Sequence, residues 1–256
     1  MKFLLLKKRA LAKGLAALLI LSASVMAVAL TGAAGVHAER TTRKLPIYAV
    51  QTEEKKVALS FDASWGADKT DSILAMMAEH DIRATFFSVG MWAEKYPDKL
   101  KSLSDSGRFE IGTHSNTHPN MPKLSKEKMT LELTASVKTI EAITGKKVEL
   151  FRAPFGDYSD RLLETAEALG LYTVQWDVDS LDWKNLSSAE IAARILKKTQ
   201  PGSIILMHND GKHTVEALPA IIEGLKNKGY SFVPIGELIY RGNFTIDHTG
   251  RQIQMG

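Results

Sequence analysis

The sequence predicts an α/β domain, a distorted (β/α) barrel with about seven parallel strands. From Lys56 onward, short apolar runs alternate with helical patterns, and glycine or proline marks most of their ends. Such alternation predicts a parallel sheet, either open and doubly wound or closed into a barrel. About seven strands fit an irregular barrel better than a full eightfold one.

The strand-like runs are Val57–Phe61, Ala84–Val89, Phe109–Gly112, Glu149–Phe151, Leu171–Gln175, Ser203–Met207 and Ser231–Val233. Helical patterns lie between them, near residues 69–80, 92–106, 125–144, 159–169, 188–198 and 214–228. We therefore place the main domain at residues 56–240. Residues 39–55 are expected to be a linker or a short capping strand, and the polar tail, 241–256, to lie loosely against the domain or to be disordered.

The N-terminal residues, 1–38, have the pattern of an export segment. Basic residues up to Lys13 precede an uncharged apolar run, 14–36, and Val36-His37-Ala38 is typical of a signal-peptidase site. The apolar run is also about long enough to span a bilayer at the ~20 residues that this requires. A cleaved signal peptide and a retained membrane anchor both remain open. In either case we expect the folded part outside the cytoplasmic membrane.

The net charge of +4 belongs to this segment. Five of the 33 lysines and arginines lie in residues 1–38, and the other 28 are balanced by 29 acidic residues. The folded part therefore lacks the excess of positive charge that is typical of nucleic-acid-binding proteins. The chain has no cysteine, which excludes disulfides, thiolate catalysis and a cysteine-bound zinc.

The first strand ends in a carboxylate, Asp62, followed by Ala63, Ser64 and Gly66. A strand that delivers an acid and then turns is a common way to place a catalytic group at the mouth of an α/β fold, although Asp62 alone could simply cap a turn. The other strand ends also lead into polar stretches, which start at Thr113, Arg152, Trp176 and His208. Because parallel strands share one carboxyl face, these stretches together predict a site.

Three of these stretches suggest chemistry. The spacing of His114 and His118 lets two imidazoles converge on one divalent ion, although surface histidine pairs are common. Arg152 would hold Asp62 ionised, or would form a structural salt bridge. His208 is either a core histidine or a general acid whose pKa is raised by Asp179 or Asp182.

In this order, the stretches resemble the polysaccharide deacetylase family, which includes the NodB-type chitooligosaccharide deacetylases, over about residues 56–240. The segment Phe61-Asp-Ala-Ser-Trp-Gly66 resembles the corresponding motif of the sporulation-associated, PdaB-like branch. The resemblance implies removal of acetyl groups from glycans with one divalent metal, often zinc. It makes Asp62 the base, Arg152 the residue that orients it, and His208 the acid, with Asp179 and Asp182 beside it. The resemblance also makes His114 and His118 the metal ligands. It implies substrate contacts for Phe155, Trp183 and Leu206.

Two positions depart from the family pattern. Phe155 replaces a tyrosine whose backbone N–H serves the oxyanion, so this change should be mild. Ala63 replaces a second aspartate that is a metal ligand, which leaves two histidines and solvent and predicts a weak, exchangeable ion.

We therefore expect a monomeric, exported deacetylase that hydrolyses N-acetyl groups of peptidoglycan or another N-acetylglucosamine polymer. The alternative is a glycan-binding or structural envelope protein that has lost the reaction, as Ala63 suggests. A glycoside hydrolase using Asp62 and Asp179 as paired carboxylates is a third possibility, but it gives His114 and His118 no task.

Overall fold

The main sheet of the protein is parallel throughout. The computed structural model describes residues 43–256, so the predicted export segment lies outside the described residues. The strand order is β6-β5-β4-β3-β2-β8-β7, and β9 pairs in parallel with the start of β2. The strands are β2 (Lys56–Ala63), β3 (Ala84–Ser88), β4 (Phe109–Thr113), β5 (Leu150–Phe151), β6 (Tyr172–Thr173), β7 (Val178–Asp179), β8 (Ile204–His208) and β9 (Ser231–Phe232). The predicted α/β fold with about seven parallel strands is confirmed.

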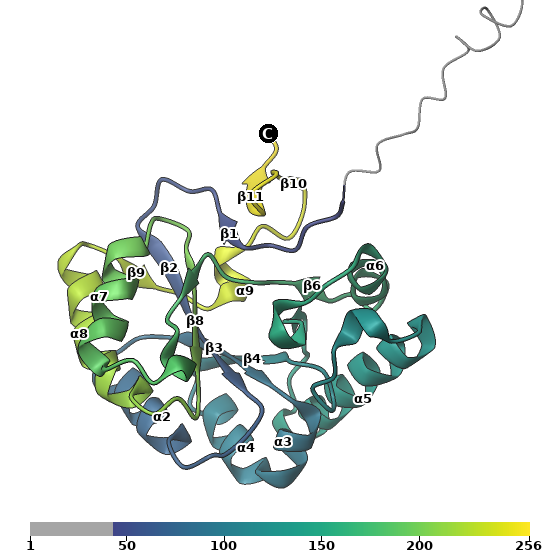
Figure 1. Ribbon diagram of the computed structural model, residues 1–256, viewed down its shortest axis with the longest axis horizontal. Coiled ribbons are helices and arrows are strands. Elements are labelled where there is room, and N and C mark those ends of the chain that lie inside the picture. Colours follow the sequence, from purple (N-terminus) through teal and green to yellow (C-terminus); the bar gives the residue numbers. More distant parts are fainter. Residues whose placement is uncertain (1–42) are drawn as a thin grey trace, which may run out of the picture. The chain divides into compact units, whose positions relative to one another are not determined.

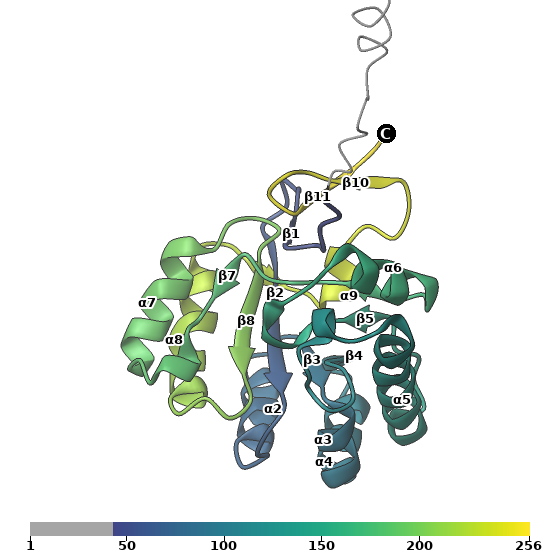
Figure 2. The ribbon, with the colours of Figure 1, turned by 45° about the vertical axis from the view of Figure 1, so that its right-hand side comes forward.

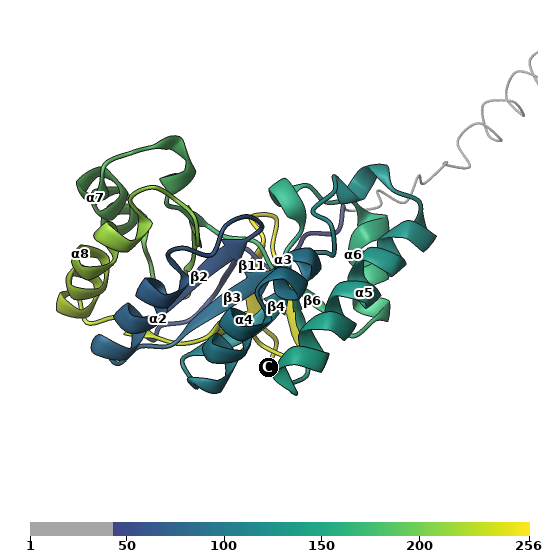
Figure 3. The ribbon, with the colours of Figure 1, turned by 90° about the horizontal axis from the view of Figure 1, so that it is seen from below.

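Helices surround the outer face of this curled sheet, as Figure 1 and Figure 3 show. They are α2 (Thr70–Glu79), α3 (Gly90–Lys95), α4 (Pro97–Asp105), α5 (Lys126–Thr144), α6 (Asp160–Ala168), α7 (Ser188–Lys198) and α8 (Thr214–Asn227). The short α9 (Ile235–Leu238) packs on the other face of the sheet, against Ala58 and Phe87 among others. The sequence pattern had predicted one helix over 92–106. The structure divides it into α3 and α4, because Pro97 has no N–H to donate and is best placed at the first position of a new helix.

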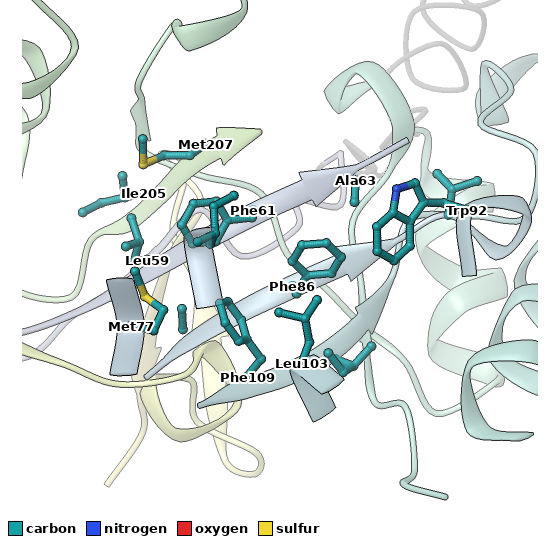
Figure 4. Close-up of a cluster of buried hydrophobic side chains, with 14 of the residues drawn as sticks. Leu59, Phe61, Ala63, Met77, Phe86, Trp92, Leu103, Phe109, Ile205 and Met207 are labelled. Atoms are coloured by element: carbon teal, nitrogen blue, oxygen red, sulfur yellow. The ribbon is translucent and has the colours of Figure 1, made fainter. Parts of the chain in front are cut away.

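The side chains of β2 alternate between two apolar clusters. Val57, Leu59, Phe61 and Ala63 belong to the large cluster between the sheet and the helices, part of which is drawn in Figure 4. Ala58 belongs to a smaller cluster that includes Phe87, Leu150, Ile204 and Ile235. Because successive strand residues point to opposite faces, Asp62 shares the inner face with Ala58, and Ala63 faces the helices.

The two ends of the described chain meet in a second, small sheet, with strand order β1-β11-β10. It lies on the side of the main sheet away from α2, α3 and α4 (Figure 2). The strands are β1 (Ala49–Val50), β10 (Phe244–Ile246) and β11 (Arg251–Gln254). The expectation of a loose or disordered tail was wrong, because residues 244–254 form a hairpin that pairs with β1. Within 39–55, the described part includes the short capping strand that was one of the two alternatives.

Between residues 43 and 256, no helix combines the length and the apolar character needed to cross a bilayer.

Candidate active site

Asp62 and His208 end neighbouring strands at the same level. In the parallel pairing of β2 with β8, their Cα atoms are direct partners. The backbone N–H of Asn209 donates to the carbonyl oxygen of Asp62 at 3.1 Å, which continues the ladder one step beyond the strands. The register of the sheet therefore brings the predicted base and the predicted acid to one edge.

Asp62 is held by a buried arginine, as predicted. The Nη1 of Arg152 donates to its Oδ1 at 2.8 Å, and Arg152 itself is fully buried, with its guanidinium over the ring of Phe87. Burial alone would raise the pKa of Asp62, but the charge and hydrogen bond of Arg152, together with smaller contributions from the neighbouring histidines, hold the pKa below its usual range. Burial lowers the pKa of Arg152 from a value so high that the guanidinium stays charged.

His208 is paired with Asp182. Its Nδ1 lies 2.7 Å from Oδ1 of Asp182, which is completely buried. The other carboxylate oxygen accepts from the backbone N–H of His208 at 2.8 Å and from the hydroxyl of Thr214 at 2.6 Å. Burial works against the charge on His208, but the bond and the charge of Asp182, together with the charges of Asp62 and Asp210, outweigh it, so the pKa of His208 is raised. The imidazole is therefore poised to hold and release a proton.

Asp179 has a different task from the one predicted. Its Oδ1 accepts from the backbone N–H of Leu181 at 2.8 Å, and Leu181 adopts a left-handed conformation with φ of 56°. This turn directs Asp182 to His208 and leaves Asp179 with no recorded bond to the histidine. The structure therefore separates the two carboxylates, assigning Asp182 to His208 and Asp179 to the turn.

The two predicted metal ligands lie side by side, with ring centroids 4.9 Å apart. His114 Nδ1 is 2.8 Å from the carbonyl oxygen of Arg152, which only accepts, so this nitrogen bears the proton and Nε2 has a free lone pair. That Nε2 lies 3.6 Å from Oδ2 of Asp62. Burial lowers the pKa of both histidines, that of His118 to about 4, so both rings are neutral at neutral pH, the form that binds a metal.

A third protein ligand is missing from this pair. Ala63 has no donor atom, is fully buried and belongs to the cluster beneath the helices. Within residues 43–256, no group of three His, Cys, Asp or Glu side chains is arranged to hold a metal ion. The donor set therefore does not fit the three-ligand metal site that the resemblance implies.

Aromatic side chains stand at the mouth of the site. Phe155 and Trp183 are 64% and 57% exposed, whereas Leu206 is buried in β8 on the face of His208. A further residue, Trp65, was not predicted. It is 65% exposed, and its ring centroid lies 6.2 Å from that of His118. Its place three residues after Asp62 was the available indication, but its exposure depends on the turn that follows β2.

Comparison with known proteins identifies the family. A model of the polysaccharide deacetylase domain matches residues 49–174. The peptidoglycan-N-acetylmuramic acid deacetylase PdaA of Bacillus subtilis is 33% identical over 197 residues, which cover 75% of this chain and 74% of PdaA. The chain belongs to the polysaccharide deacetylase family. A Bacillus cereus peptidoglycan-N-acetylglucosamine deacetylase is 34% identical over 70% of this chain, which spans 66% of that relative's length and 63% of that of the Bacillus subtilis protein YlxY.

Solved structures of this family share the fold. Wild-type BA3943 of Bacillus anthracis, described as a CE4 family pseudoenzyme, has a TM-score of 0.74 at 33% identity, covering 86% of this chain and 76% of its own. A BA3943 mutant, described as a pseudoenzyme with restored enzymatic activity, has a TM-score of 0.73 at 37% identity, covering 80% and 74%. The Bc1960 peptidoglycan N-acetylglucosamine deacetylase has a TM-score of 0.73 at 31% identity, covering 75% and 92%. The family thus includes both deacetylases and a pseudoenzyme with this architecture.

Proposed function

We propose that this chain binds N-acetylated glycan strands of peptidoglycan at the described site, and that Ala63 holds its deacetylase activity far below that of a three-ligand relative. One observation supports this most directly. The side chain of residue 63 packs into the apolar cluster under the helices, and only His114 and His118 remain as predicted metal ligands. Two imidazoles without the carboxylate ligand that the family has at position 63 form a weak site for a divalent ion.

The substrate class rests on the relatives and on the mouth of the site. Two relatives are peptidoglycan deacetylases by name, one for N-acetylglucosamine and one for N-acetylmuramic acid. Exposed aromatic rings beside buried charged groups suit a sugar, whose ring has apolar faces and polar edges. Together these features support an N-acetylated glycan as the ligand.

The acid and base groups are in place for amide hydrolysis. Asp62, kept ionised by Arg152, can accept a proton from a water molecule aimed at the acetyl carbonyl. Protonated His208, held by Asp182, can donate a proton to the leaving nitrogen, which gives acetate and a free amine. What the described residues do not provide is a strong electrophile at the carbonyl oxygen, and the barrier therefore stays high.

We also propose that residues 1–38 direct export, so that the folded domain meets peptidoglycan outside the cytoplasmic membrane. The support is the basic start, the uncharged stretch and the small residues before Glu39. Retention or cleavage is tested by N-terminal sequencing of the protein recovered from its native cells. A link to sporulation rests only on the likeness of residues 61–66 to that branch.

The experiment is a comparison of full-length wild type with Ala63→Asp and Asp62→Asn. Acetate release from a polymer of N-acetylglucosamine is measured with and without added zinc. We expect the wild type to match the Asp62→Asn background, and Ala63→Asp with zinc to exceed it. Acetate release by the wild type that equals that of Ala63→Asp would overturn the proposal.

A second candidate is a working deacetylase with a metal on His114 and His118. The observation that favours it is the 3.6 Å separation between the His114 Nε2 lone pair and the Asp62 carboxylate, a pair of electron-rich atoms suited to a cation between them. This candidate predicts that zinc raises acetate release by the wild type itself. The same assay therefore separates the two.

A further inference from the structure

Trp65 is an exposed apolar side chain on an anchored turn. The carbonyl oxygen of Gly66, its neighbour, accepts from the indole N–H of buried Trp92 at 2.6 Å and from the side-chain amide of Asn209 at 3.0 Å. Gly66 itself has φ of 56°, a conformation that favours glycine. The backbone of the turn is therefore fixed from two sides, while its tryptophan remains 65% exposed.

Three rings from three separate loops meet above the site. His118 lies between the other two, with centroid distances of 6.2 Å to Trp65 and 4.6 Å to Phe155. The rings meet edge to face, at interplanar angles of 63° and 69°. We call Trp65, His118 and Phe155 the aromatic platform. Its outer members are among the most exposed large apolar side chains of the described chain.

Backbone strain supports a functional origin for this arrangement. His118 and Phe155 both have positive φ, 59° and 62°, which is rare for a bulky aromatic residue. Such conformations are energetically costly and cluster at ligand-binding sites. Here the strained conformations keep the rings of His118 and Phe155 in contact at the surface, where burial in the core does not offset the strain.

We propose that the aromatic platform is a metal-independent binding surface for one pyranose ring of an N-acetylated glycan, with Trp65 as its main contact. The C–H groups on a sugar face pack against the electron-rich face of an indole, and the rigid turn lowers the ordering cost of binding. This inference rests on the proposed function. It adds that recognition persists when the site holds no metal, because none of the platform contacts requires one.

The test is binding of the β-1,4-linked N-acetylglucosamine tetramer to the full-length protein in mild detergent with excess chelator. Calorimetry gives the affinity of wild type, Trp65→Ala and Trp65→Phe. Leu131→Ala is the matched control, because Leu131 is 66% exposed but lies on α5. We expect Trp65→Ala to bind about tenfold more weakly, Trp65→Phe roughly threefold and Leu131→Ala as the wild type does. Thermal unfolding checks that each variant is folded.

Tryptophan fluorescence provides a second readout. The chain has four tryptophans, and we expect the tetramer to change the emission of the wild type more than that of Trp65→Phe, which keeps the exposed Trp183. Equal affinity of wild type and Trp65→Ala would overturn the platform while leaving the proposed function intact. Binding that needs added zinc would overturn its independence of metal. No binding to the wild type under any condition would overturn both the platform and the proposed function.

Discussion

The two halves of the site differ in how completely their residues are partnered. In the acid–base half, Asp62 is bound to Arg152 and His208 to Asp182, each through a buried or largely buried charge pair. In the metal half, His114 and His118 lie together, but residue 63 turns its methyl group to the helices. The charge pairs stabilise the fold whether or not a reaction occurs. A residue that only binds a metal does not stabilise the fold in this way, so its replacement changes the stability of the metal-free protein little.

The largest expected effect is on the acid–base half. Arg152→Met should lower the free energy of unfolding by about 3 to 5 kcal/mol, because it leaves the Asp62 carboxylate buried without its partner. Urea unfolding measures this. Arg161→Met is the control, since this exposed arginine donates its hydrogen bonds to the backbone carbonyls of Pro122 and Leu124, and it should change stability by less than about 1 kcal/mol. Equal losses of unfolding free energy in the two variants would show that the buried Arg152–Asp62 pair contributes no more to stability than an exposed arginine.

In the metal half, the informative change adds a charged group instead of removing one. Ala63→Asp should lower the stability of the metal-free protein by about 1 to 3 kcal/mol, because a carboxylate replaces a methyl group in an apolar cluster. Zinc should restore part of this loss as a rise in melting temperature. Ala63→Asn has the same shape without the charge and should gain little from zinc. A fully stable metal-free Ala63→Asp protein would mean that residue 63 does not face the cluster.

Asp182→Asn should weaken the interaction with His208, because the asparagine keeps an oxygen that can accept a hydrogen bond but loses the negative charge. We expect the pKa of His208 to fall, as followed by NMR titration, and the variant to lose about 1 kcal/mol of stability near pH 6. Because the folded pKa of His208 is raised, its contribution is complete below the unfolded pKa near 6.5 and is lost as the pH rises through the folded value. The difference between the two proteins should therefore shrink at higher pH.

Asp179→Asn is the matched control for this change. Its carboxylate bonds to the backbone of Leu181, so the titration of His208 should stay as in the wild type. A change in the pKa of His208 in Asp179→Asn but not in Asp182→Asn would mean that Asp179, the other carboxylate suggested by the sequence, is its partner.

His118→Gln should change how stability depends on pH. The pKa of His118 is lowered to about 4, so between pH 4 and 6.5 the unfolded chain binds more protons at this residue than the folded one. Stability should therefore rise with pH across this window, and His118→Gln should make the rise shallower. Unfolding in urea at several pH values measures the slope. An unchanged slope would show that His118 is not the titrating group.

Sequence periodicity predicted seven of the eight strands of the main sheet and most helices, because apolar runs alternate with helical patterns and glycine or proline marks most of their ends. The eighth strand, β7, was missed, because Val178 stands between Asp177 and Asp179 and not within an apolar run. The tail hairpin had a signal, the alternation in Phe244–Ile246 and Arg251–Gln254 around a turn at Asp247–Gly250, and it was overlooked.

Within the site, residue types could be predicted but not all of their partners. The bond from Arg152 to Asp62 was predicted from the carboxyl edge that parallel strands share, although β3 and β4 lie between their two strands. The choice of Asp182 over Asp179 depends on the positive φ of Leu181, which a leucine seldom adopts and no pattern indicates. The orientation of Ala63 could have been deduced from strand alternation, but only once the end of β2 was known.

The central claim is that one missing ligand at position 63 separates this site from a metal-binding one. Zinc titration of full-length wild type and Ala63→Asp by calorimetry tests it most directly. We predict weak binding by the wild type and an affinity more than about 100-fold higher for Ala63→Asp, since even indirect ligand contacts are worth 10–100-fold. Tight binding of one zinc ion by the wild type, unchanged in Ala63→Asp, would contradict the claim.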